Sequence, residues 1–135
     1  REIFLVLDDP DVAALEDEIA AACERGIPTS AVLTGVAPLR CSQIVRHPPL
    51  ESQLHELSGT LVVVVDANEV LVAANGAGRE MTATVTRNRN LVLITRQFVW
   101  MELFAQRIFA HMDGELLARL DPADRRVFES ARREA

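Results

Sequence analysis

Few side chains in this sequence have the chemistry of a catalytic group, and those few lie far apart. Histidines occur at His47, His55 and His111, and the chain contains no lysine. An imidazole nucleophile acting on a phosphodiester needs a neighbouring cation, such as a lysine, to hold the phosphate oxygens. No serine lies in the G-x-S-x-G turn that presents a nucleophilic hydroxyl. The sequence therefore predicts no catalytic residue and no enzyme activity.

The remaining composition excludes several further classes of protein. Cys23 and Cys41 are too few for a disulfide scaffold and are not spaced as a metal pair, so we expect them to be small buried side chains in a reducing cytoplasm. We predict no metal site and no cofactor. The net charge of −6 argues against DNA binding by this chain itself. No apolar run is long enough to cross a membrane.

Two polar residues are candidates for contacts with a ligand. Asp66 follows the apolar run Leu61 to Val65, and Asn75 follows the next apolar run along the chain. Polar groups at strand ends line the crevice where open α/β sheets usually bind ligands. The alternative is that both are turn residues, because Asp and Asn hydrogen-bond to nearby backbone.

The elements that must position these residues begin with a β-α-β unit. We expect a strand over residues 2–7, a helix over residues 11–25 capped by Asp8-Asp9-Pro10, and a strand from Thr29 to Thr34. Such a unit favours a parallel pair of strands. Further strands are expected over 42–47, 61–65, 70–73 and 82–87, with a hairpin turn at residues 66–68 and the 61–65 strand buried on both faces. The fold class is α/β with a mixed sheet.

A long helix is expected from about Asn90 to Asp113. The stretch Leu91-Val-Leu-Ile94 also has strand propensity, so a helix start near Arg96 is the alternative. Apolar residues recur there at alternating spacings of three and four, as in a coiled-coil seam. The seam residues are Leu91, Ile94, Phe98, Met101, Ala105, Ile108 and Met112. Two more apolar stripes, one of Val99, Leu103 and Ala110 and one of Trp100 and Phe104, leave little polar surface. A helix that is apolar nearly all round is buried on more than one side. We therefore predict a homodimer through Phe98, Trp100, Met101, Phe104 and Ile108. The alternatives are contact with a domain upstream of this sequence and burial entirely within this domain.

Residues 59–66 have the outline of the phospholipase D core motif, H-x-K-x4-D. Gly59 stands at the His position and Leu61 at the Lys position, and only Asp66 is retained. The order of elements, the helix end Glu-Arg-Gly-Ile-Pro and the stretch Thr82-Ala-Thr-Val-Thr-Arg-Asn88 resemble the effector domain of TrmB-type transcriptional regulators. The resemblance spans about residues 2–113. It implies a degenerate phospholipase D-like half-fold that senses a small molecule and dimerises.

Two departures from the family pattern bear on function. Sugar-responsive members carry an extra C-terminal β-rich subdomain. Nothing after residue 113 matches that subdomain, so the resemblance does not predict a sugar or any other particular effector. Ala73-Ala74 replaces the Gly-Ser that follows the motif in active phospholipases, which agrees with lost catalysis.

The domain organisation expected from this resemblance is an effector and dimerisation domain over residues 1–113 and a C-terminal helical extension over 114–135. Because the first residue is Arg1 and a strand pattern follows at once, we expect a DNA-binding domain upstream, through which a cytoplasmic regulator would bind DNA. The alternatives are a module that only binds protein partners and, as the weakest option, a residual phosphodiesterase.

Overall fold

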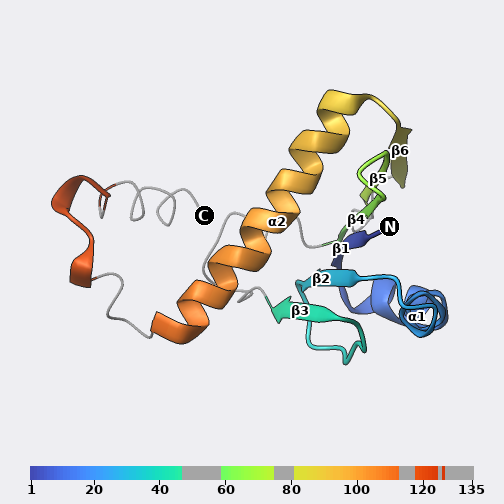
Figure 1. Ribbon diagram of the computed structural model, residues 1–135, viewed down its shortest axis with the longest axis horizontal. Coiled ribbons are helices and arrows are strands. Elements are labelled where there is room, and N and C mark those ends of the chain that lie inside the picture. Colours follow the sequence, from blue (N-terminus) through green and yellow to red (C-terminus); the bar gives the residue numbers. More distant parts are fainter. Residues whose placement is uncertain (47–58, 75–80, 113–117, 125, 127–135) are drawn as a thin grey trace.

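Six strands form one sheet with a long helix on one side and a shorter helix on the other (Figure 1). The computed structural model describes residues 1–46, 59–74, 81–112, 118–124 and 126. The elements are β1 (Ile3–Leu7), α1 (Asp9–Glu24), β2 (Thr29–Leu33), β3 (Gln43–Arg46), β4 (Thr60–Val65), β5 (Glu69–Ala74), β6 (Thr82–Thr86) and α2 (Arg89–Met112).

The β-α-β unit at the start of the chain is confirmed. Asp8 caps α1 by accepting a hydrogen bond from the Asp11 N–H, and the Asp11 carboxylate accepts one from the Asp8 N–H. This reciprocal pair satisfies two of the N–H groups that a helix start leaves free. Burial raises the pKa of Asp11 above its usual range. At the other end Gly26 takes a positive φ of 73°, which lets the chain turn into β2.

The sheet is mixed, as predicted, and its order is β3-β2-β1-β4-β5-β6. The three strands β1, β2 and β3 are parallel. The remaining pairs, β1 with β4, β4 with β5 and β5 with β6, are antiparallel. The predicted hairpin at residues 66–68 joins β4 to β5, and Asn68 N–H closes the turn on the carbonyl of Val65 at 2.9 Å.

Each face of the sheet has its own hydrophobic core. On one face α2 packs across the strands, and its Val92, Val99 and Leu103 join strand residues such as Phe4 and Val64. On the opposite face α1 packs on β1 and β2, where Val12 and Ile19 meet Leu5, Leu7, Ala31 and Leu33. The result is a helix-sheet-helix sandwich in which α2 spans more strands than α1 does.

The prediction that residues 61–65 are buried on both faces was wrong in part. Val62 and Val64 are buried beneath α2, whereas Leu61 and Val63 are only half-buried and Val65 is exposed. The reason is that α1 covers β1 and β2 and leaves β4 at the margin of its own face. The apolar pattern of a strand does not show how many strands of the sheet a packed helix covers.

The long helix begins at Arg89, one residue before the predicted start. Asn88 acts as its cap, because its side-chain oxygen accepts hydrogen bonds from the N–H groups of Asn90 and Leu91. The Val92 N–H then donates to the Asn88 carbonyl at 2.9 Å. This cap explains why the β-branched stretch that follows is helical. Within the described residues, no helix is long and apolar enough to cross a membrane.

The expected last helix is seen only at its start. The Asp121 carboxylate accepts hydrogen bonds from the N–H groups of Ala123 and Asp124, and residues 122–124 are helical. The rest of the expected helical extension, residues 125 and 127–135, lies outside the described residues, as does the predicted domain boundary at residues 113–114.

Candidate functional site

The outer half of α2 is the most unusual surface in the described part of the chain. Val92, Val99 and Leu103 already bury one stripe of this helix against the sheet. The opposite half, from Leu91 to Phe104, is also apolar and is exposed, with Leu93 60% and Ile94 65% accessible. Monomeric proteins rarely leave a contiguous apolar patch of this kind open to water. We call this surface the outer α2 face. Its exposed apolar side chains are Leu91, Leu93, Ile94, Phe98, Trp100, Met101 and Phe104.

Most of the residues predicted for a dimer interface lie on the outer α2 face. Phe98, Trp100, Met101 and Phe104 are exposed, and Ile108 is half-buried. The rings of Trp100 and Phe104 stack nearly parallel, with centroids 5.3 Å apart and planes at 6°. Stacking of two large rings on the helix surface fixes their side chains before any partner binds, so less side-chain entropy is lost on association.

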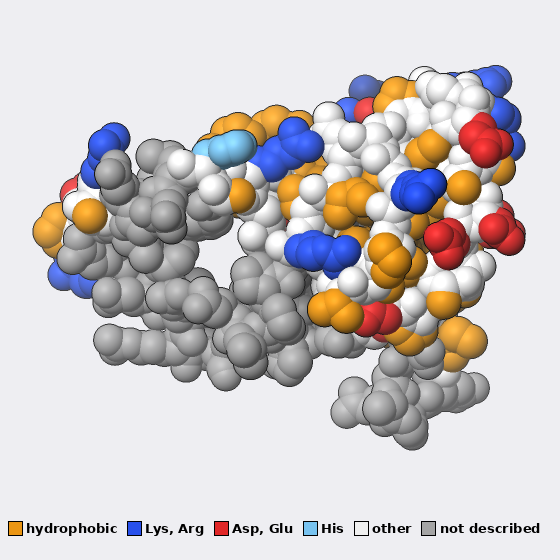
Figure 2. Space-filling view, turned by 90° about the horizontal axis from the view of Figure 1, so that it is seen from below, with side chains coloured by type: hydrophobic (Ala, Val, Ile, Leu, Met, Phe, Trp, Pro, Cys, Tyr) orange, Lys and Arg blue, Asp and Glu red, His pale blue; other side chains and the backbone are white. Residues whose placement is uncertain are grey.

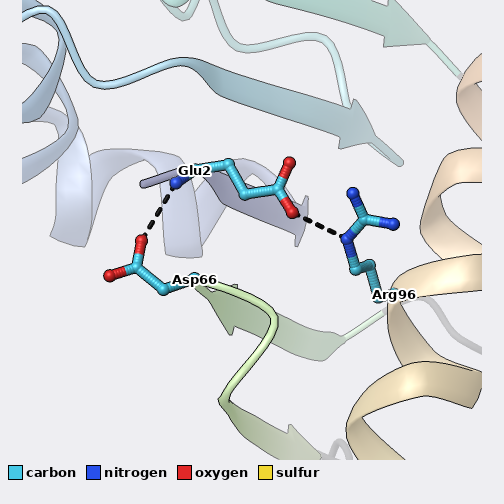
Figure 3. Close-up of polar contacts among 3 residues, drawn as sticks. All are labelled: Glu2, Asp66 and Arg96. Atoms are coloured by element: carbon cyan, nitrogen blue, oxygen red, sulfur yellow. Dashed lines mark hydrogen bonds and ion pairs between the residues drawn. The ribbon is translucent and has the colours of Figure 1, made fainter.

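Asp66 has a structural role in the sheet. Its Oδ1 accepts a hydrogen bond from the Glu2 N–H at 3.0 Å, and its own N–H donates to the Glu2 carbonyl at 2.9 Å. In Figure 3 its second carboxylate oxygen points away from Glu2. Asp66 takes a φ of 54° and Ala67 one of 49°. Asp tolerates this left-handed conformation better than most side chains. Asp66 therefore lies in the turn as predicted, but its side chain bonds the distant Glu2 and not the nearby backbone.

Glu2 extends this contact to α2. Its carboxylate accepts a hydrogen bond from Arg96 Nε at 2.7 Å, and the Arg96 guanidinium lies over the ring of Phe4, 5.2 Å from its centroid. Figure 3 shows Glu2 between Asp66 and Arg96. The hydrogen bond that Arg96 donates to the Glu2 carboxylate holds the pKa of Arg96 above its usual range. These contacts fix the start of β1 to both the β4–β5 turn and the long helix.

The second candidate ligand contact, Asn75, lies outside the described residues. Its neighbour Ala74 pairs with Thr60 at the start of β4, whereas Asp66 follows the end of the same strand. With about 3.4 Å per residue, the two ends of this hairpin are roughly 17 Å apart. Gly59, which aligns with the His of the phospholipase D motif, is likewise separated from Asp66 by the whole of β4. A carboxylate at Asp66 therefore has no contact with a group at position 59.

A polar cluster that the sequence did not reveal lies at the carboxyl ends of the parallel strands. Asp9 Oδ1 accepts a hydrogen bond from the Ala37 N–H at 2.7 Å. The Arg46 guanidinium donates to the carbonyls of Gly35 and Ala37, each at 2.9 Å. Ligands often bind at this edge of a sheet, but these charged groups already hold the loop after β2. The only sequence signal was the position of Asp9 and Arg46 at strand ends.

The histidines and cysteines do not assemble a site among the described residues. His111 is exposed in the last turn of α2, and His47 and His55 lie outside the described part. Cys23 and Cys41 are free and only half-buried, less buried than expected. Burial raises the pKa of the Cys41 thiol. In the residues that the structure describes, no group of three or more potential ligands is arranged to hold a metal ion.

The charges are unevenly distributed over the molecule. Figure 2 shows hydrophobic side chains at the surface between arginines, with most of the acidic side chains toward the end where Figure 1 places α1. The exposed acids of that helix include Glu16, Asp17 and Glu18. Acidic α1 and apolar α2 thus lie on opposite sides of the sheet.

Comparison with known proteins adds no identification, because no family model and no curated protein matches the chain.

Proposed function

We propose that the chain is the effector-sensing and dimerisation domain of a transcriptional regulator of the TrmB type, built on a phospholipase D-like half-fold without its catalytic groups. The outer α2 face is the main support for this proposal, because it is an exposed apolar surface on a helix whose opposite side is already buried against the sheet. The element order, a β-α-β start followed by a hairpin, a further strand and a long helix, is the one on which the resemblance rests.

A second copy of the same chain is the occupant that best fits the outer α2 face. Leu91, Ile94 and Phe98 begin a seam that continues through Met101 at alternating spacings of three and four. A seam of this kind packs against an identical seam by inserting its side chains between those of the partner. In a two-fold dimer the same face of both copies forms the contact, so one apolar face per chain is enough to bury both. A symmetric dimer would also present paired DNA-binding domains to paired half-sites.

Loss of the catalytic groups favours sensing over hydrolysis. Gly59 and Leu61 replace the imidazole and the ammonium group of the phospholipase motif, and Asp66 holds the start of β1 in place. A pocket that lacks both cations would select a neutral or weakly polar effector. Asp66 remains a proposed contact, because it can offer the carboxylate oxygen that does not bind Glu2. The predicted crevice shared with Asn75 is not kept, because Ala74, which precedes Asn75, lies at the opposite end of the hairpin from Asp66.

A thermal-shift screen of neutral small metabolites against the purified chain tests the sensing role. A compound that binds only the native state stabilises it by about 2.7 kcal/mol at 100 times its dissociation constant. We expect at least one saturable shift that is reduced in Asp66→Asn, a variant that retains a hydrogen-bond acceptor in the turn. If a broad screen gives no saturable shift while the chain is dimeric, the alternative of a ligand-free interaction module replaces effector sensing.

A further inference from the structure

The last strand of the sheet, β6, leaves one edge of its backbone unpaired by any described strand. Its pairing with β5 runs from Val70 opposite Thr86 to Ala74 opposite Thr82, and β6 ends the strand order. Figure 1 shows it at the margin of the sheet near the start of α2. Residues 82–85 are all exposed, Val85 by 61%. An open edge of this kind is a template for another strand.

The usual features that prevent edge pairing are missing from β6. Proteins protect edge strands with charged side chains, proline or a bulge. The five residues Thr-Ala-Thr-Val-Thr contain no charge and no proline, and they pair with β5 in unbroken register. The opposite edge differs, because β3 ends at Arg46 and is followed in the sequence by Pro48-Pro49. An edge strand without charged side chains, proline or a bulge is suited to pair with a strand of another chain.

The side chains of β6 match a second copy of β6 run in the opposite direction. If Thr84 lies on a two-fold axis, Thr82 falls opposite Thr86 of the other copy, and Thr84 falls opposite itself. Directly opposed threonines are a favourable cross-strand pair. On the other face the same register sets Ala83 opposite Val85, so that a small side chain meets a larger one. Both faces are thus self-complementary in one register.

The flanking residues tolerate this register as well. Met81 falls opposite Arg87 of the other copy, so the two arginines are never directly opposed. Each Arg87 also keeps its ion pair with Glu69, with Nη2 and Oε2 3.2 Å apart. Like charges directly opposite would be destabilising, and this register avoids them.

We propose that β6 is a second association surface, at which two copies of the chain pair their β6 strands antiparallel about a two-fold axis at Thr84. The six-stranded sheets of the two copies then form one continuous sheet. This contact is separate from the outer α2 face and does not depend on the regulator assignment. Because the paired strands have only five residues each, the β6 contact is weaker than the contact through the outer α2 face. Dimers formed through the outer α2 face therefore associate through β6 only at high protein concentration.

A charge-swap experiment tests the axis directly. Thr84 is exposed, so Thr84→Arg and Thr84→Glu should fold normally, and each places two like charges opposite each other on the axis. Sedimentation velocity over a range of concentrations measures the assembly, with circular dichroism as the check on folding. We expect wild type to form species of at least twice the mass of the largest species of either variant, because each dimer carries two β6 edges. An equimolar mixture of the variants should restore these larger species.

Thr84→Val is the matched control, because it keeps a β-branched side chain and adds no charge. It should assemble as wild type does. The proposal is overturned if Thr84→Arg has the wild-type mass distribution at every concentration, or if the mixture of folded Arg and Glu variants stays at the smaller mass. Because Met101→Asp acts on the outer α2 face and not on β6, a β6-paired dimer should persist in that variant.

Discussion

Arg96 of α2 binds Glu2 at the start of β1, with Nε and Oε1 2.7 Å apart, although 94 residues separate them in the sequence. Both side chains are 31% exposed, so solvent only partly screens the ion pair. The Arg96 guanidinium also lies over Phe4, a residue of the core beneath α2. This ion pair links the start of β1 to α2, which packs across the sheet.

Replacing Arg96 by Gln should lower the free energy of unfolding by about 1 kcal/mol, the sum of a partly screened ion pair and a cation–π contact. Urea denaturation of wild type and Arg96→Gln measures the change. The matched control is Arg87→Gln, because Arg87 pairs with Glu69 but is 72% exposed. We expect that control to lie within about 0.5 kcal/mol of wild type. An equal loss in both variants would contradict the role given to Arg96.

Replacing Ala67 by Gly should stabilise the protein. Ala67 has a φ of 49° in the β4–β5 turn, where a Cβ costs roughly 1–2 kcal/mol. The greater freedom of glycine in the unfolded chain offsets part of that gain. We expect a net increase of about 0.5–1 kcal/mol in the free energy of unfolding. Ala73→Gly, at a position of β5 that is paired with a strand on each side, is the control and should be destabilising. A loss of stability in Ala67→Gly would show that the turn is not strained.

Replacing Gly35 by Ala should destabilise the loop after β2. A Cβ at this position would overlap the Asp9 carboxylate, which accepts the Ala37 N–H. Displacing that carboxylate should cost about 1–3 kcal/mol. Chemical denaturation of a double-mutant cycle with Asp9→Ala is the sharper measurement, because the cost of Gly35→Ala should largely disappear once the carboxylate is gone. If the cost is the same in both backgrounds, the overlap is not its cause.

The chain should not hydrolyse phosphodiesters. The motif positions that would hold a nucleophile and a phosphate-binding cation are Gly59 and Leu61, and Asp66 hydrogen-bonds to Glu2. Assays with a generic chromogenic phosphodiester should give no turnover above buffer. Turnover that co-purifies with wild type and is lost in a folded Asp66→Ala variant would refute the loss of catalysis.

The local elements of the fold could be predicted because their signals lie within short stretches of sequence. Asp8 and Gly26 mark the ends of α1, and residues 66–68 mark the hairpin turn. The order of strands was not predictable in this way, since β1 lies between β2 and β4 through contacts between residues far apart in the chain. The same is true of Asp66, whose partner Glu2 is 64 residues away.

The orientation of α2 could not be read from its periodicity. A helix that is apolar nearly all round offers several stripes, and the most regular seam, with Phe98 and Met101, proved to face outward. The stripe with Val92 and Val99 faces the sheet instead. Compact side chains let the helix approach the valine-rich strands closely, whereas the rings of Trp100 and Phe104 would hold it away. Packing volume, and not hydrophobicity alone, decides which stripe is buried.

Sedimentation equilibrium of the purified chain measures whether the outer α2 face joins two copies. We expect wild type to be at least a dimer at tens of micromolar protein, and Met101→Asp to have half its mass, since an uncompensated charge in an apolar contact costs several kcal/mol. Ala14→Asp, at an exposed position of α1 on the other side of the sheet, is the control and should retain the wild-type mass. A folded wild-type chain that sediments as a monomer at this concentration would show that the outer α2 face does not join two copies.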